Sequence, residues 1–345
     1  MSDWFFNFNA IMKIMSILGQ GAFGSVVKTE SGVAKIYSQE DAIDAGLEID
    51  TLTLIKRNRK SFKDSHEIKF GERPKSKIVS LKKWESHPQD IRLHFKHYAS
   101  TLSDIIDSDK ISFSVAMHIY HCIMIGLAEL QYSKIIHGDL KPDNIMVYHT
   151  GDTKSQKKLT KAIKAENCKV IDIKIIDFNK SVNAESAIRP LNIQTLYYTP
   201  PEIIVGDRGY NYSVDIWTAG CILNEMLTGM HLFNVFHKDS TISQQTISQT
   251  SSCQSSDKRE TFDHFALLHL YHQALGPFEN VPDTIDSRKY FSNGKLFGSL
   301  PTKKAKWQTF NNAVDTIFER TFHYDYNNRL SIDEYYSIHN RVNSR

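Results

Sequence analysis

Short apolar runs, interrupted by glycines and polar residues, characterise the first hundred residues of the chain. From Lys13 to Tyr37 the pattern predicts a strand, a glycine turn and two further strands. The stretch 40–56 predicts a helix, and the pattern returns to strand over Ile91–Tyr98. The N-terminal third is therefore predicted to be rich in strands with one helix. The helix prediction depends on roughly helical spacing of Ile43, Leu47, Leu52 and Ile55.

Beyond residue 100 the periodicity becomes mainly helical. Phe113–Tyr132 has a wide apolar face, Tyr212–Gly229 has the pattern of a buried helix, and the remainder to about His339 is helical in pattern. Two strands are predicted between these helices, over Ile145–Tyr148 and Val170–Phe178. The lysine-rich stretch that separates the two strands has the character of an insertion.

Composition adds little to this picture, except at a few places. The 345 residues are 41% hydrophobic and 23% charged, with a formal charge of +3, which does not favour nucleic acid as the main partner. We interpret the basic clusters Lys56–Lys60 and Lys154–Lys164 as solvated loops or helix faces; a contact with nucleic acid or an acidic protein is the alternative. Residues 239–260 are rich in Ser, Thr and Gln and predict a disordered surface excursion.

The cysteine pattern and the absence of a targeting pattern bear on the compartment. No CxxC pair or short metal-type spacing occurs, so neither a zinc site nor a disulfide framework is indicated. No uninterrupted apolar run approaches membrane-spanning length. We expect a soluble, monomeric, intracellular protein of the cytoplasm or nucleus, with no membrane partner. The cysteines are Cys122, Cys168, Cys221 and Cys253.

The first candidate for chemistry is a glycine-rich loop of the form G-x-G-x-x-G. Glycines let backbone amides approach phosphate oxygens closely, but the same spacing also opens dinucleotide-binding units, where a helix follows. Here the following residues have the pattern of strands. By itself the loop is weak evidence for nucleotide binding. Its residues are Leu18, Gly19, Gln20, Gly21, Ala22, Phe23, Gly24, Ser25 and Val26.

Lys35 is the second candidate, because it lies in the strand-like run "VAKIY". A strand lysine that points into a cleft can pair with nucleotide phosphates, but it needs a carboxylate to hold it there. Glu48, on the predicted helix that follows, is the natural partner. Alone, Lys35 would be read as a surface lysine at a sheet edge.

The third candidate is the polar stretch "HGDLKPDN", which ends at Asn144. Phosphoryl transfer needs a carboxylate near the acceptor hydroxyl, a cation near the transferring phosphate and oxygen ligands for Mg²⁺. Asp139, Lys141 and Asn144 supply these types, and Asp177 can supply the principal metal carboxylate. As an isolated string, a polar turn is the competing interpretation.

Together these motifs resemble, in order, those of eukaryotic-type protein kinases from about Met12 to about Asn340. The resemblance implies a bilobal α+β fold: a small antiparallel-sheet lobe with one main helix over residues 1–97, and a larger, mainly helical lobe over residues 98–345. It also implies that the glycine loop covers the phosphates of ATP and that Lys35 pairs with those phosphates and with Glu48. Its implied catalytic and metal-binding residues are Asp139 as base, Lys141 at the transferring phosphate, and Asn144 with Asp177 at Mg²⁺.

The resemblance continues downstream in "TLYYTPPE", which is similar to the family's T-x-x-Y-x-A-P-E segment. It implies that Thr195 lies near the catalytic aspartate, that Tyr198 lies in the substrate-facing loop, and that Arg329 pairs with Glu202. Asp215 is implied to brace the catalytic loop. Lysine two residues after the catalytic aspartate resembles serine/threonine kinases, and the later helices are similar to the cyclin-dependent, MAP and CLK group, SR-protein and CLK kinases above all.

Four residues depart from the family pattern. Gly138 stands where many kinases have arginine, so no cation is present there to clamp a phosphorylated activation loop, and we expect activity without such phosphorylation. Asn179 replaces the glycine of the family's Asp-Phe-Gly motif. Asparagine tolerates left-handed backbone geometry better than other non-glycine residues, so we expect the replacement to be accommodated. Gln194 and Pro200 alter the peptide-binding surface. An active Mg-ATP-dependent kinase of protein serine and threonine is therefore expected; a pseudokinase scaffold and a small-molecule phosphotransferase are the alternatives.

Overall fold

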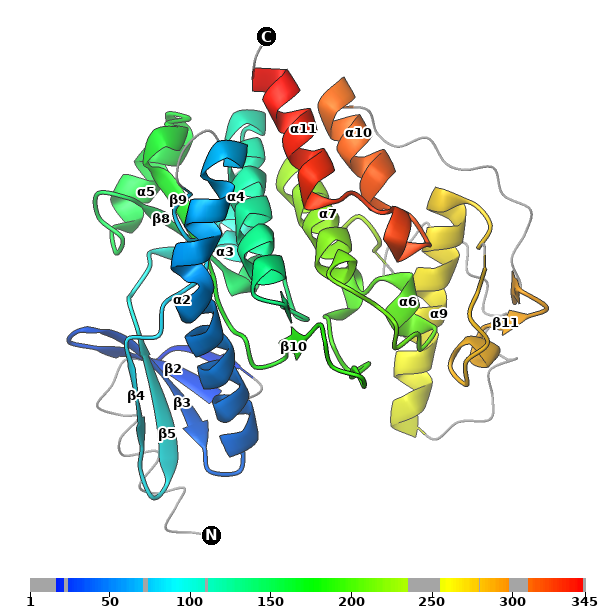
Figure 1. Cartoon of the computed structure of the whole chain (residues 1–345), viewed down its shortest axis with the longest axis horizontal. Coiled ribbons are helices and arrows are strands. Elements are labelled where there is room, and N and C mark those ends of the chain that lie inside the picture. The colour runs from blue at the N-terminus through cyan, green and yellow to red at the C-terminus, as the bar shows by residue number, and fades with distance from the viewer. Residues whose placement is uncertain are drawn as a thin grey trace.

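The fold has two lobes, seen at the lower left and at the top and right of Figure 1. In this computed structural model a five-stranded antiparallel sheet forms the small lobe, and helices form most of the large one. This confirms the predicted bilobal α+β architecture. The structure describes residues 17–21, 24–70, 74–108, 111–234, 255–278, 280–297 and 310–343.

The small-lobe sheet places alternate residues on its two faces. Its strand order is β1-β2-β3-β5-β4. On β3, Ala34 and Ile36 pack with Val27 in a small apolar cluster, whereas Lys35 and Tyr37 both reach Glu48 of the helix that follows. The period of two thus places Ala34 and Ile36 on one face of the sheet and Lys35 and Tyr37, next to Glu48, on the other. The strands are β1 Ile17–Gly21, β2 Gly24–Thr29, β3 Gly32–Ser38, β4 Lys83–Ser86 and β5 Asp90–Phe95.

Helix α2 (Ala42–Phe70) is much longer than the predicted 40–56 and runs from the sheet to the side of α4 (Figure 1). The apolar spacing used to predict it was wrong in its first turns, because Ile43 is 86% exposed and Leu47 is 38% exposed. The face that packs inward carries Leu52, Ile55 and Phe62, which are all buried. The second half of α2 therefore packs against the large lobe.

The large lobe is built around α4, with α7 packed against it. Among the described residues, α4 is the one helix with the length and hydropathy of a membrane span, and 72% of that window is buried inside the protein, as in a core helix. Trp217 of α7 lies against Phe233, Tyr271 and Phe322 in a buried aromatic cluster. The helices are α3 Leu102–Ser108, α4 Phe113–Tyr132, α5 Gln156–Lys164, α6 Pro201–Ile204, α7 Ser213–Thr228, α9 Ser255–Leu275, α10 Asn312–Thr321 and α11 Ile332–Asn343.

Short sheets connect the lobes and position the loops. The predicted strand 170–178 ends early, because β9 stops at Ile175 and the next residues form the loop that carries Asp177. The predicted helical remainder also contains a small hairpin. The lysine-rich insertion forms α5, whose lysines are exposed while Leu159 and Ala162 are buried. The remaining strands are β6 Ser100–Thr101, β7 Ile135–Ile136, β8 Ile145–His149, β9 Ile171–Ile175, β10 Val182–Asn183, β11 Phe291–Ser292 and β12 Lys295–Leu296.

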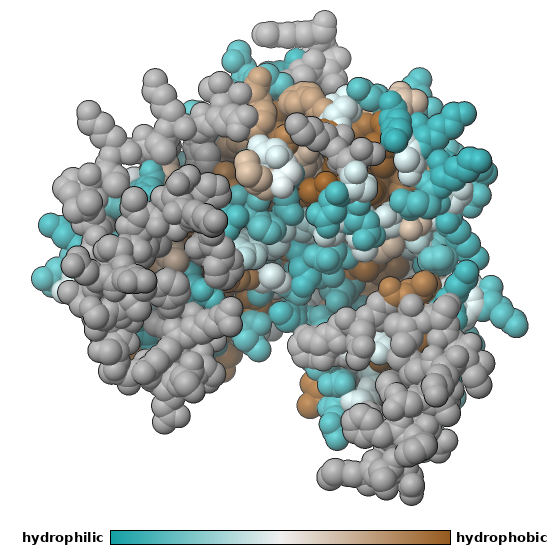
Figure 2. Space-filling model, turned by 180° about the vertical axis from the view of Figure 1, so that it is seen from behind, coloured by the Kyte–Doolittle hydropathy of each residue, from teal (hydrophilic) through white to brown (hydrophobic). Residues whose placement is uncertain are grey.

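The predicted surface excursion 239–260 is only partly within the described residues. Residues 239–254 lie outside them, whereas Ser255–Glu260 begin α9, so the prediction of disorder was wrong for this part. Three of the four cysteines are described as free thiols, and Cys253 lies outside the described residues. From behind, the described surface is mostly hydrophilic, with smaller hydrophobic areas between (Figure 2).

Candidate active site

The glycine-rich loop joins β1 to β2 at the edge of the small-lobe sheet. Gly21 pairs with Gly24, and Ala22 and Phe23 at the tip lie outside the described residues. Gly24 has φ +159°, and a Cβ there would lie 2.5 Å from the carbonyl oxygen of Ile36. The third glycine is thus required by the close approach of β2 to β3. On the flanking strands lie Leu18, Gly19 and Gln20 of β1 and Ser25 and Val26 of β2.

Lys35 lies between two carboxylates. Its Nζ is 2.9 Å from Glu48 Oε2 and 2.6 Å from Asp177 Oδ1. Burial alone would lower the pKa of Lys35, but attraction by the two carboxylates outweighs it and raises that pKa. Tyr37 Oη also donates to Glu48, and Phe178 N donates to its other oxygen at 3.3 Å. The arrangement thus brings together Lys35 of β3, Glu48 of α2 and Asp177, which follows β9.

Asp215 of α7 holds the polar stretch that follows β7 through backbone hydrogen bonds. The backbone N–H groups of His137 and Gly138 donate to its two carboxylate oxygens at 2.7 and 3.2 Å. Burial raises the pKa of Asp215, although these donors and His137 oppose it. His137 Nδ1 accepts from Asp139 N at 3.2 Å, which leaves Nε2 to donate to the Ile176 carbonyl at 3.0 Å. The loop is therefore fixed to both α7 and the segment after β9.

Asp139 points into a polar site with cations beside it. Its Oδ1 accepts from Thr195 Oγ1 at 2.8 Å, and Lys141 Nζ lies 3.5 Å from Oδ2. Lys141 also donates to Thr195 Oγ1 at 3.3 Å. Lys180 Nζ lies 3.7 Å from the same Oδ2. The sequence interpretation missed Lys180, although its place two residues after Phe178 in the metal-binding loop was a signal that could have identified it.

Asn144 and Asp177 form the donor pair that could hold Mg²⁺. Asn144 Nδ2 donates to the backbone carbonyl of Asp139 at 2.8 Å, which fixes the orientation of the amide and leaves its oxygen as the acceptor. Asp177 has φ +67°, a strained conformation that the loop holds in place. One amide oxygen and one carboxylate fit Mg²⁺, which prefers oxygen ligands and completes its octahedron with phosphate oxygens and water.

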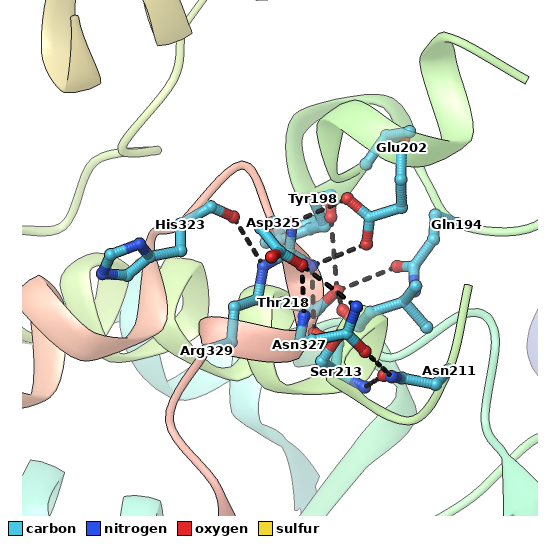
Figure 3. Close-up of polar contacts among 12 residues, drawn as sticks. Gln194, Tyr198, Glu202, Asn211, Ser213, Thr218, His323, Asp325, Asn327 and Arg329 are labelled. Carbon is cyan, nitrogen blue, oxygen red and sulfur yellow. Dashed lines mark hydrogen bonds and ion pairs between the residues drawn. The ribbon is translucent and has the colours of Figure 1, made fainter. Parts of the chain in front are cut away.

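The segment after Thr195 is anchored by a buried ion pair between α6 and the loop before α11 (Figure 3). Arg329 Nη1 and Nη2 lie 2.6 Å from the two oxygens of Glu202, in bidentate geometry. The Arg329 side chain is 0% exposed and that of Glu202 is 3% exposed. Arg329 also donates to the His323 carbonyl at 2.9 Å and lies over the Trp217 ring. This pair fixes the end of the segment to the core of the large lobe.

Tyr198 and Gln194 also turn inward in this segment. The Tyr198 side chain is buried, and its hydroxyl donates to Glu225 at 2.7 Å, so it braces the loop from within. Gln194 has φ +74°, and its side-chain oxygen accepts from Thr218 at 2.9 Å. Pro200 immediately precedes α6.

One of the departures from the family pattern, Gly138, has a backbone explanation. Gly138 has φ +76°, and a Cβ there would lie 2.5 Å from the Lys180 carbonyl oxygen, so this loop conformation accepts glycine alone. Asn179 is absent from the described non-glycine residues with positive φ; the positive φ occurs two residues earlier, at Asp177. Asn179 therefore does not depend on the tolerance of asparagine for left-handed backbone geometry.

Comparison with known proteins matches residues 12–339 to the protein kinase domain. The serine/threonine-protein kinase AFC3 of Arabidopsis thaliana is 27% identical over 302 residues, which cover 82% of this chain and 65% of the relative. A probable cyclin-dependent serine/threonine-protein kinase of Dictyostelium discoideum is 27% identical over 229 residues, 64% of this chain and 14% of the relative. Dual specificity tyrosine-phosphorylation-regulated kinase 3 of Homo sapiens is 29% identical over 233 residues, 64% of this chain and 34% of the relative. The chain thus spans less than two thirds of the length of these relatives.

Proposed function

The chain belongs to the protein kinase family, and from this premise we propose that it transfers the γ-phosphate of Mg-ATP to serine and threonine hydroxyls of proteins. The observation that carries the proposal is the position of Lys35 Nζ, within hydrogen-bonding distance of both Glu48 and Asp177. A cation in this place can hold nucleotide phosphates next to the metal-binding carboxylate. The similarity to a cyclin-dependent kinase agrees with the group predicted from the sequence.

The residues of the catalytic loop provide the acid–base chemistry. When bound, ATP would supply the phosphoryl group, and Mg²⁺ would neutralise part of the negative charge of the phosphates. Asp139 Oδ accepts the hydrogen bond, and then the proton, of the acceptor hydroxyl, and Thr195 holds this carboxylate in place at 2.8 Å. Lys141 Nζ, 3.5 Å from Asp139, places a positive charge where the transferring phosphate becomes most negative.

Replacing the proposed base tests this function directly. Asp139→Ala should lower the rate of transfer to a basic or Arg-Ser-rich peptide by about 10³-fold or more, while ATP binding is largely retained. Asp143→Ala is the matched control, because it removes an exposed carboxylate from the same loop and should leave the rate within about threefold. Undiminished transfer by Asp139→Ala would refute the assignment.

The two alternatives make different predictions for the same assay. A pseudokinase scaffold would transfer no phosphate. Against this alternative, none of the residues proposed to bind metal or phosphate is missing: Lys35 contacts both Glu48 and Asp177, and the Asn144 amide is held through its nitrogen. A small-molecule phosphotransferase would ignore peptides. The Glu202–Arg329 pair and the match to the protein kinase domain both support a protein substrate.

We further propose that activity does not require phosphorylation of the activation segment. This segment runs from Asp177 to Glu202, and Arg189 within it donates to the carbonyl of Ala184 in the same segment and to that of Tyr210, eight residues beyond it, at 2.6 and 2.5 Å. Tyr210 Oη in turn donates to the Pro190 carbonyl at 2.7 Å. The hydrogen bonds from Arg189 to backbone carbonyls hold this segment in place. In kinases with a phosphorylated activation segment, an arginine–phosphate pair has that task.

Phosphatase treatment of the recombinant protein tests this second proposal. Dephosphorylated protein, verified by mass spectrometry, should keep its rate within about twofold, because the segment is ordered by Arg189 rather than by phosphate. Loss of activity that returns on rephosphorylation would contradict it.

We also propose that the protein acts as a monomer in the cytoplasm or nucleus and that ATP and Mg²⁺ are its cofactors.

A further inference from the structure

A carboxylate that takes no part in the site described above lies buried in the helix α4. Glu129 is 0% exposed and is surrounded along α4 by apolar residues. Its Oε1 accepts from Arg59 Nε at 3.0 Å and from Ser76 Oγ at 2.8 Å, and its Oε2 accepts from Lys77 N at 3.2 Å. A charge in such a place is stable only when a cation and hydrogen-bond donors compensate it. Arg59 supplies that charge.

Arg59 belongs to α2, so the ion pair joins the helix of the small lobe to the core helix of the large lobe. The guanidinium also donates to Ser80 Oγ at 2.7 Å and to the Ile78 carbonyl at 3.4 Å. One turn further along α2, buried Phe62 packs on Tyr132 of α4 with ring centroids 5.8 Å apart. The second half of α2 is thus fixed to α4 by the Arg59–Glu129 ion pair and by the contacts of Phe62 and His66 with Tyr132.

The first half of the same helix carries Glu48 to Lys35. Eleven residues separate Glu48 from Arg59, about 16 Å along the helix axis, and neither proline nor glycine interrupts them. A continuous helix transmits a displacement at one end to the other. A shift or rotation of α2 that separates Glu48 from Lys35 would therefore distort or break the contact of Arg59 with Glu129 and take from this buried carboxylate the cation that is hydrogen-bonded to it.

We infer that Arg59 and Glu129 are positioning residues that lock α2 in the orientation in which Glu48 meets Lys35. The kinase then needs no activating partner to push α2 inward. The catalytic part of this inference rests on the proposed function; the locking of the helix does not, because it can be measured without phosphate transfer.

The experiment compares Arg59→Met with the double variant Arg59→Met/Glu129→Gln and with Arg57→Met as control. Arg57 is exposed on the same helix, so its loss should change nothing. Arg59→Met leaves the Glu129 charge without its cation and should lower both Tm and kcat, the latter by roughly tenfold, with KM for the peptide nearly constant. Amide hydrogen exchange over residues 45–58 should become faster by a similar factor.

The double variant separates positioning from simple stability. It removes the buried negative charge, and glutamine can accept from Lys77 N through its oxygen while its NH2 group donates to Ser76 Oγ, so Tm should recover. The lock remains absent, so kcat should stay low and exchange in α2 should stay fast. Recovery of kcat together with Tm, or unchanged exchange in folded Arg59→Met, would overturn the inference.

The design also separates failure of the inference from failure of the proposed function. If the wild-type protein transfers no phosphate, the proposed function fails. The rate of amide hydrogen exchange in α2 then tests by itself whether the Arg59–Glu129 pair holds the helix. If Arg59→Met does not fold, the double variant, whose charge is compensated, provides both measurements.

Discussion

The Glu202–Arg329 pair offers the sharpest test of how the segment next to the catalytic loop is held. Both side chains are almost fully buried, and each guanidinium–carboxylate contact is 2.6 Å. Glu202→Ala leaves the Arg329 charge buried without its anion, which typically costs about 3–5 kcal/mol. The retained bond to the His323 carbonyl and the Trp217 ring offset part of this cost, so we expect about 3 kcal/mol. For a chain of 345 residues, that loss corresponds to a decrease in Tm of roughly 4 °C.

A second ion pair in the same lobe serves as the matched control. Arg320 and Glu334 lie 2.7 Å apart, but each side chain is 43% exposed. Solvent screens such a pair, but Glu334 also accepts from Ser331 N at 3.1 Å at the start of α11, so Glu334→Ala should cost about 1–2 kcal/mol, still less than Glu202→Ala. Urea unfolding followed by tryptophan fluorescence, with thermal unfolding in parallel, measures both variants. Equal destabilisation by Glu202→Ala and Glu334→Ala would refute the argument that burial determines the strength of the pair.

Three further predictions concern the catalytic centre and the dependence on pH. Lys35→Met should lower kcat by about 10²-fold or more, because it removes the cation between two carboxylates; a rate assay that shows less than a fivefold loss would contradict this. Gly138→Ala should destabilise the protein by about 2 kcal/mol in urea unfolding, because φ is +76° and the Cβ would meet a carbonyl; a neutral effect would show that the loop can rearrange. Burial, with the neighbouring His339, lowers the pKa of His121 from 6.5 to about 3, so the unfolded chain binds the extra proton between these values. Stability should therefore fall as pH decreases from 6.5 towards 3, by at most about 1.4 kcal/mol per pH unit from this group, and His121→Gln should flatten the dependence of Tm on pH; an unchanged slope would contradict it.

The sequence predicted the parts of this protein in which local pattern and local chemistry coincide. The strands β1 to β3 follow from alternating apolar residues and glycines, and α4 follows from its helical apolar face. The motif containing Asp139, Lys141 and Asn144 predicted a set of side chains that the fold does hold on one loop. In each case the residues that determine the structure are neighbours in the sequence.

The predictions failed where contacts with a distant part of the chain determine the local structure. Ile43 and Leu47 fit a helical apolar stripe, yet the face of α2 that packs inward at that end carries Ala45 and Glu48, and both predicted residues are exposed. Ser255–Glu260 are polar and were predicted to be disordered, but they form the first turns of a helix whose later residues pack into the large lobe. Asn179 was expected to be accommodated because asparagine tolerates left-handed backbone, but the positive φ lies at Asp177, in a loop that α2 holds through the bond from Phe178 N to Glu48.

Glu129 shows what a sequence can and cannot indicate about such contacts. It is the one residue among Asp, Glu, Lys and Arg in the twenty residues of α4, and a lone charge in an apolar helix signals a buried partner. The identity of the partner could not be read from the pattern, because Arg59 lies 70 residues earlier, within a basic cluster that was interpreted as solvated. Only one arginine of that cluster faces α4, and the direction of α2 determines which. The orientation of a helix is thus fixed by a pair that neither local sequence reveals alone, and in this protein the same orientation brings Glu48 to Lys35.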